Sequence, residues 1–139
     1  MASRLDNGVC DPQALEAKDQ ILLRQVQASL PVLADLSRAD LLLYGRVSAD
    51  RAVVVSHARP NSLSPLYPEP LTGSVVTASG RPEVLKTFDA RPWRRLVRTA
   101  TVRGAPIARE VLPLYGERNR VIAVLVVDTS WLAHERQLR

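Results

Sequence analysis

The chain has few of the residues that mark the common catalytic, metal-binding and secreted classes of protein. Its 139 residues include one cysteine, Cys10, and two histidines, His57 and His134. A single cysteine forms no internal disulfide, and neither histidine has a second Cys, His or carboxylate at a metal-ligand spacing. The six glycines form no phosphate-binding loop, and no G-x-S-x-G nucleophile elbow occurs. We therefore expect a regulatory chain without catalytic residues or a metal. The sequence assigns no cofactor.

Long apolar runs are also absent. The longest run, Val121 to Val127, is far shorter than the roughly 20 residues that a membrane-spanning helix needs. Residues 1–8 lack the apolar core of a signal peptide. We expect residues 1–10 to be a disordered leader and residues 11–128 to form one folded domain, since 46% of the chain is hydrophobic. The expected location is the cytoplasm, without membrane contact.

Lysine is scarce, so the net charge of +5 comes almost entirely from arginine. The region 91–120 contains eight arginines against two glutamates. A basic stretch of this kind is one signal of a nucleic-acid-binding module. However, only Trp93 and Tyr115 are present there as rings on which bases could stack. We expect no nucleic-acid partner, and the module remains an alternative interpretation of residues 91–120.

Helices are predicted at the two ends of the domain. Asp11 and Pro12 form a typical helix start. One amphipathic stripe follows, made of apolar residues at positions 15, 22, 26, 30 and 33. Pro31 predicts a break or kink, with a second short helix over about 31–37. At the other end, Thr129 or Asp128 is expected to cap an outgoing helix over 129–139.

Five strands are predicted between these helices. The runs rich in Leu, Val and Tyr cover 41–46, 52–59, 97–102, 107–115 and 120–127. Four prolines predict a loop over 60–73, and short helices are expected over 72–79 and 82–88. Strands grouped at both ends of a chain are typical of the α+β class. We predict a single antiparallel sheet of about five strands, in the order 2-1-5-4-3, flanked by helices.

The second predicted strand carries the main candidate for a ligand-binding face. By the two-residue period of a strand, Val53, Val55, His57 and Arg59 share one face. If this face lines a cavity, His57 and Arg59 place a titratable and a cationic group inside it, which favours an anionic or phosphorylated ligand. The alternative is a hydrogen-bonded core histidine, with Arg59 extending past the strand end into solvent.

Three other residues join this set. Tyr44 on the neighbouring strand offers a ring and a hydroxyl. Trp93 either caps a pocket or packs on the sheet. Arg109 and Glu110 fall on opposite faces of one strand, so one of them is expected to reach solvent or an ion pair. The candidate ligand-binding residues are Tyr44, Val55, His57, Arg59, Trp93 and Arg109.

Several short segments form a pattern when taken in order. They are Leu33 to Leu43, Ala58-Arg59-Pro60-Asn61, Leu66 to Gly73, Gly80-Arg81-Pro82, Glu110 to Leu114 and Arg120 to Leu125. Together they resemble the N-terminal GAF-like sensor domain of soluble two-component sensor histidine kinases, over about residues 30–128. The resemblance implies a GAF/PAS-like fold and the role of a cytosolic sensory input domain.

The resemblance also implies partners. If the chain is a fragment of a longer protein, a ligand or partner signal would pass through the terminal helices to a kinase core in cis, outside this chain. A free-standing relative that lost its kinase is the alternative. We expect a homodimer, with the stripe from Leu15 to Leu33 and the tail helix as candidate contacts, unless the stripe packs on its own sheet. A small molecule is a candidate ligand. A dimerisation module without any ligand is the other alternative.

Overall fold

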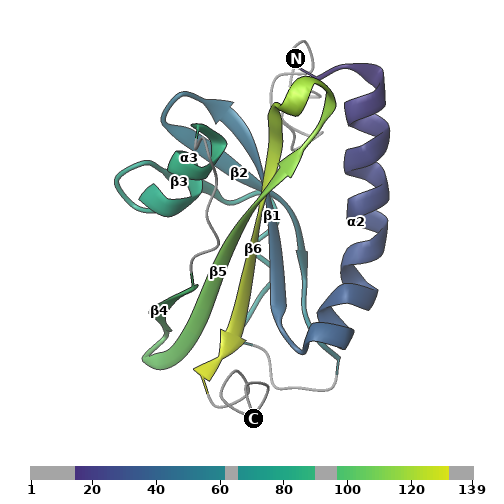
Figure 1. The fold of residues 1–139 in the computed structure, drawn as a ribbon. Helices are drawn as coiled ribbons and strands as arrows, with labels where there is room; N and C mark the ends of the chain where they lie inside the picture. The colour runs from purple at the N-terminus through teal and green to yellow at the C-terminus, as the bar shows by residue number, and fades with distance from the viewer. Residues whose placement is uncertain (1–14, 62–65, 90–96, 132–139) are drawn as a thin grey trace.

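The computed structural model of the chain describes residues 15–61, 66–89 and 97–131. Within these residues one antiparallel sheet has a helix on each of its faces (Figure 1). The elements, in chain order, are α2 (Ala17–Ser37), β1 (Asp40–Ser48), β2 (Arg51–Ala58), β3 (Val75–Thr77), α3 (Pro82–Asp89), β4 (Val97–Val102), β5 (Ala105–Tyr115), the 3-10 turn η2 (Glu117–Asn119) and β6 (Val121–Ser130).

The order of strands in the sheet is β3-β2-β1-β6-β5-β4, and all neighbouring strands are antiparallel. The predicted five-strand order is confirmed, and β3 adds a sixth strand at one edge. The helix expected over 72–79 is therefore wrong. Val75 and Val76 instead pair with Val53 and Ala52 of β2. The open edge of β2 presents unpaired N–H and C=O groups, and this segment satisfies them.

Helix α2 is continuous through Pro31, so the predicted break at that residue is wrong. Proline removes one backbone hydrogen bond, but the packing on both sides of it compensates. Leu30 and Ala34 flank Pro31 and are almost completely buried against the sheet. Arg38 ends the helix in the left-handed region, with φ of 55°.

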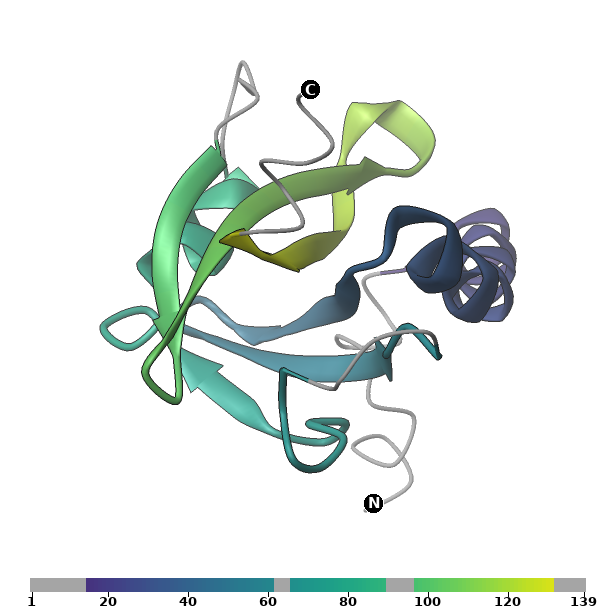
Figure 2. The same cartoon turned by 90° about the horizontal axis from the view of Figure 1, so that it is seen from below.

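The sheet separates two apolar cores (Figures 1 and 2). We call the side of the sheet under α2 the α2 face and the opposite side the α3 face. Most of the predicted apolar stripe packs on the α2 face, including the buried Leu15 and Leu30 and the partly buried Leu22 and Val26. The α3 face is covered by residues 66–89, which we call the cover. The cover includes α3, and its middle part, β3, is also the edge strand of the sheet. The core of the α3 face contains Leu42, Tyr44, Val54, Tyr67, Val84, Phe88, Ile107, Val124 and Val126, among others. Both faces of the central strands β1, β2 and β6 are therefore covered, whereas β3 and β4 are largely exposed.

A β-bulge in β2 changes which side chains share a face. Leu43 pairs with Ser56 and Tyr44 pairs with Val54, so the register skips Val55. The predicted face of Val53, Val55 and His57 is therefore wrong, because a bulge interrupts the alternation of side chains. His57 lies opposite Leu42 and faces the cover.

Strand β6 ends at Ser130, so Asp128 and Thr129 are strand residues and do not cap a helix. The remainder of the predicted outgoing helix, residues 132–139, lies outside the described residues. The same is true of the predicted leader 1–10 and of the helix start at Asp11. Among the described helices, neither is long and apolar enough to cross a membrane.

Candidate functional site

Asp128 and Arg109 form the centre of a polar cluster within the α3 face. They are cross-strand partners on β6 and β5. Arg109 Nε donates to Asp128 Oδ1 at 2.8 Å and Nη2 donates to Oδ2 at 3.0 Å. The aspartate side chain is 0% exposed and the arginine side chain 9%. Two parallel hydrogen bonds between opposite charges make this a bidentate pair, which is among the strongest side-chain contacts in proteins.

Two residues of the cover attach to this pair. The Tyr67 hydroxyl donates to Asp128 Oδ2 at 2.5 Å. Glu83, in the first turn of α3, accepts from Arg109 Nη1 at 3.4 Å. The cluster therefore joins the sheet to both parts of the cover, the loop and the helix, through charged and polar contacts.

His57 and Asp40 extend the cluster along β2 and β1. His57 Nε2 lies 2.8 Å from Asp40 Oδ2, and both side chains are almost fully buried. The backbone N–H of Leu71, in the cover, donates to His57 Nδ1 at 3.0 Å. Since Nδ1 accepts this hydrogen bond, the proton on the ring is on Nε2 and is donated to Asp40. The histidine is thus a third polar attachment of the cover.

The two halves of the cluster adjoin one another. Asp40 and Asp128 are direct cross-strand partners on β1 and β6. The Tyr67 ring packs edge-on against the His57 ring, with centroids 5.3 Å apart and planes at 85°. We call the six residues the buried polar cluster: Asp40, His57, Tyr67, Glu83, Arg109 and Asp128.

The surroundings raise the pKa of two members of the cluster, Tyr67 and Arg109. Burial raises the pKa of Tyr67 well above its ordinary value, and the neighbouring Asp128 carboxylate raises it further. Burial alone would lower the pKa of Arg109, but the hydrogen bonds and charge of Asp128 outweigh it and raise that pKa. Tyr67 is therefore a neutral donor and Arg109 a permanent cation. Burial also raises the pKa of Tyr44, on the same face.

The structure brings together only some of the residues predicted as ligand-binding. Tyr44, His57 and Arg109 lie on the α3 face. Val55 is the bulge residue of β2 and is buried. Arg59 follows the end of β2 and is half-buried. Trp93 lies outside the described residues, so its expected place over a pocket remains a prediction.

Four members of the cluster were missed by sequence reasoning: Asp40, Tyr67, Glu83 and Asp128. A usable signal existed for the two aspartates. Asp40 alternates with Leu42 and Tyr44, and Asp128 with Val124 and Val126, so each acid shares an apolar face by the two-residue period. A carboxylate on a buried face requires a partner. Tyr67 and Glu83 gave no such signal, because they belong to a loop and a helix start.

The protonation of His57 can be observed directly. We expect long-range 1H–15N spectra at neutral pH to show one protonated ring nitrogen, Nε2. The Leu71 amide should exchange slowly, and His57→Ala should speed its exchange about tenfold or more, since the amide loses its acceptor. The His134→Gln variant identifies which ring signal belongs to His57. A protonated Nδ1, or unchanged Leu71 exchange in His57→Ala, would contradict this arrangement.

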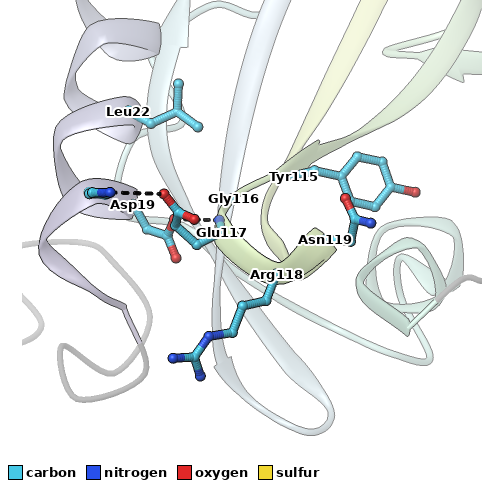
Figure 3. A pocket seen from close by; sticks show the side chains of 8 residues that line it. Asp19, Leu22, Tyr115, Gly116, Glu117, Arg118 and Asn119 are labelled. Carbon is cyan, nitrogen blue, oxygen red and sulfur yellow. Dashed lines mark hydrogen bonds and ion pairs between the residues drawn. The ribbon is translucent and has the colours of Figure 1, made fainter.

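A separate hollow of about 530 Å³ lies beside the first turns of α2 (Figure 3). It is bounded by Lys18, Asp19, Leu22, Tyr115, Gly116, Glu117, Arg118 and Asn119. Asp19 is buried, and its Oδ1 accepts the backbone N–H of Glu117 at 2.8 Å. The lining mixes both signs of charge, so it selects no class of ligand. The hydrogen bond between Asp19 and Glu117 attaches α2 to the turn between β5 and β6.

The basic stretch 91–120 does not act as one positive surface in the described residues. Arg109 is buried and paired with Asp128. Arg118 lies 3.5 Å from Glu16, and Arg120 lies 3.9 Å from Asp19. Acidic residues therefore offset three of its arginines, which removes support from the nucleic-acid alternative.

Comparison with solved structures supports the predicted class. A structure described as the sensor region of a sensor histidine kinase matches with a TM-score of 0.65 and 28% identity. The match covers 86% of this chain and 40% of that one, so this chain spans less than half of that sensor region. The antiparallel sheet with helices on both faces is a GAF-like fold, as predicted.

Two regulators of transcription share the fold at lower identity. An IclR-family transcriptional regulator from Brucella abortus matches with a TM-score of 0.53 and 12% identity, over 84% of this chain and 56% of that one. An IclR transcriptional regulator from Alicyclobacillus acidocaldarius matches with a TM-score of 0.56 and 17% identity, over 99% and 76%. These two matches concern the fold alone.

A family model matches the sequence over nearly the whole chain. Residues 9–139 match the family described as "Histidine kinase PdtaS, GAF domain". The chain belongs to this family of histidine kinase GAF domains. Comparison with curated protein sequences gives no match.

Proposed function

We propose that this chain is the sensory input domain of a cytosolic histidine kinase, and that it passes a ligand or partner signal to a kinase core outside this chain. The family and the similarity to a sensor region support the sensory role. The observation that carries the proposal is the buried polar cluster. It attaches the cover to Asp128, two residues before β6 ends at Ser130. A change in the cover therefore acts close to the point where the chain leaves the sheet.

The proposed mechanism is a shift between two positions of the cover. In the observed position, Tyr67, Leu71 and Glu83 are among the contacts that hold it to the sheet. The Arg46–Asp89 ion pair and the pairing of β3 with β2 hold it as well. A ligand that binds more tightly when some of these contacts are broken favours the other position. The terminal helices then carry the difference to the kinase core. A ligand with equal affinity for both positions would transmit nothing.

An anionic ligand fits this mechanism. Arg109 is a permanent cation on the α3 face, and its contact with Glu83, at 3.4 Å, is long compared with its contacts to Asp128. An anionic group that replaces Glu83 would accept the hydrogen bond from Arg109 Nη1 in its place and release α3, while Asp128 still neutralises Arg109. Tyr44 and His57 on the same face are the other proposed ligand contacts. We propose no catalytic step within this chain.

The test is autophosphorylation of a full-length kinase that contains this domain. Tyr67→Phe removes the hydroxyl that donates to Asp128 but keeps the ring against His57. Losing one hydrogen bond to a charged group loosens the cover by about 1–2 kcal/mol, so the basal rate or the response to signal should change about fivefold or more. The direction shows whether the observed position of the cover belongs to the active or the inactive state.

The matched control is Tyr115→Phe, which removes a hydroxyl from a tyrosine that is 40% exposed on β5. It should leave both rate and response unchanged. Native mass spectrometry of the purified chain, before and after mild denaturation, tests for a bound ligand. The proposal fails if folded Tyr67→Phe kinase behaves like the Tyr115→Phe control in every assay.

A further inference from the structure

The contact between Leu71 and His57 exists in only one protonation state of the histidine ring. The Leu71 backbone N–H donates to His57 Nδ1 at 3.0 Å, so Nδ1 carries no proton while this hydrogen bond is made. A proton added to the neutral ring would sit on Nδ1 and point at the Leu71 N–H. Two donors cannot form a hydrogen bond with one another, so the protonated ring and the Leu71 contact exclude each other.

Asp40 allows the ring to take up that proton. His57 Nε2 lies 2.8 Å from Asp40 Oδ2, and the two side chains are 0% and 1% exposed. They belong to β2 and β1, which pair directly, so this contact persists when the cover moves. A carboxylate beside an imidazole favours its protonated form. Asp40 therefore stabilises the protonated ring in both positions of the cover, whereas Leu71 opposes it only in the observed position.

The charged and titratable groups around His57 come from several elements. Asp40 and the Tyr67 ring contact it directly, and Arg59, two residues along the chain, is half-buried. The groups that act in turn on Tyr67 or on Tyr44 are Arg81, Glu83, Arg109 and Asp128. Among these kinds of side chain, an imidazole is the one that ordinarily changes charge between about pH 5 and 8. Tyr67 and Arg109 lie further from this range, because their pKa values are raised.

The part of the cover that depends on His57 is the segment 66–71. Beyond it, Gly73 has φ of 90°, and its N–H donates to Val54 O at 2.8 Å. Val75 and Val76 then pair with β2. These later contacts join backbone groups and include no titratable side chain, so a proton on His57 leaves them in place. Gly73 thus lies between a segment that responds to protonation and a strand that does not.

From these contacts we infer that protonation of His57 at Nδ1 releases the segment 66–71 from the sheet, so that the domain responds to acidification. The inference rests on the proposed function and deepens it, because the proton is a ligand that prefers one position of the cover. Losing the Leu71 contact makes the proton affinity about tenfold or more higher in the released position. The segment carries Tyr67, whose hydroxyl donates to Asp128 near the end of β6.

A pH titration of the purified chain, followed by NMR, tests the release. Between about pH 8 and about pH 5, long-range 1H–15N spectra should show His57 Nδ1 gaining a proton. The protection factor of the Leu71 amide, which corrects for the intrinsic effect of pH on exchange, should fall about tenfold or more over the same range. The Gly73 amide is the internal control and should keep its protection. Nδ1 protonation with Leu71 still protected, equal losses at both amides, or a ring that stays neutral until the chain unfolds would overturn the inference.

Three variants assign the effect to His57. His57→Gln offers an amide oxygen to Leu71 but gains no proton, so its Leu71 protection should not depend on pH. Asp40→Asn removes the charge that favours the protonated ring, so release should need about tenfold more protons or higher. His134→Gln is the matched control and should behave like the unaltered chain. Release that persists in His57→Gln, or is lost in His134→Gln, would show that another group titrates.

The titration of the unaltered chain decides the question even if His57→Gln and Asp40→Asn fail to fold. The autophosphorylation assay of Tyr67→Phe is made at one neutral pH and does not depend on these results. Failure of the proton-driven release and failure of the sensory role are therefore distinguishable.

Discussion

Replacing Asp128 with alanine is expected to lower the free energy of unfolding by about 3–5 kcal/mol, because it leaves the buried Arg109 guanidinium without its main counter-charge and with only the longer contact to Glu83. The Arg109 side chain is only 9% exposed, and both of its short hydrogen bonds end on Asp128. Tyr67 loses its acceptor in the same variant. Such a loss is a large part of the total stability of a domain of this size. Urea denaturation followed by circular dichroism measures it.

Two further variants separate this effect from the loss of any acidic residue. Asp50→Ala removes an exposed carboxylate that accepts a hydrogen bond from Ser48 in a turn, and it should change stability by about 0.5 kcal/mol or less. The double variant Arg109→Met/Asp128→Leu replaces the ion pair with apolar side chains and should recover most of the loss. A cost for Asp128→Ala no larger than that of Asp50→Ala would contradict the buried ion pair.

Replacing Gly116 with alanine is expected to cost about 1–3 kcal/mol through overpacking. A Cβ at this position would lie 2.8 Å from Ile122 Cγ2 and closer still to Asp19 Oδ1, and both side chains are 2% exposed. Gly116 has φ of −101°, which alanine also adopts, so the loss reports packing and not backbone strain. Thermal or urea unfolding measures the cost.

Gly80→Ala is the matched control for this substitution. Its Cβ would meet Thr77 Oγ1 at 3.3 Å in an exposed turn, where the side chain can adjust. We expect a change well below that of Gly116→Ala. The double variant Asp19→Ala/Gly116→Ala should show a smaller loss than the two single losses added, because removing the carboxylate makes room for the new methyl group. Strict additivity would show that Asp19 does not cause the strain.

Much of the fold was predictable because it depends on local patterns. Strand runs such as 41–46 and 107–115 are long, apolar and bounded by turn residues, and the structure places strands there. The predicted helix over 82–88 is confirmed as α3, which begins at Pro82. The predicted order of the five main strands was also correct. Strands that follow one another in the chain pair as hairpins, so only the way in which β1–β2 joins β4–β6 remained to be predicted.

The candidate site was predictable only in part. His57 was selected because its strand face was expected to line a cavity, and Arg109 because either Arg109 or Glu110 was expected to reach solvent or an ion pair. The face assigned to His57 was wrong, because the bulge at Val55 cannot be read from alternation. The contacts of Tyr67 and Glu83 with the cluster could not be predicted, since each joins residues more than 20 positions apart in the chain.

The sequence by itself determined the α+β class, the order of the five main strands and the family. The class and the order follow from the periodicity of apolar residues, and the family follows from short segments that occur in a fixed order. Only the tertiary structure decided that α2 continues through Pro31, that Val75 to Thr77 form a strand, and which acid partners Arg109. Each of these depends on packing or hydrogen bonding between distant segments, and such contacts override local preference.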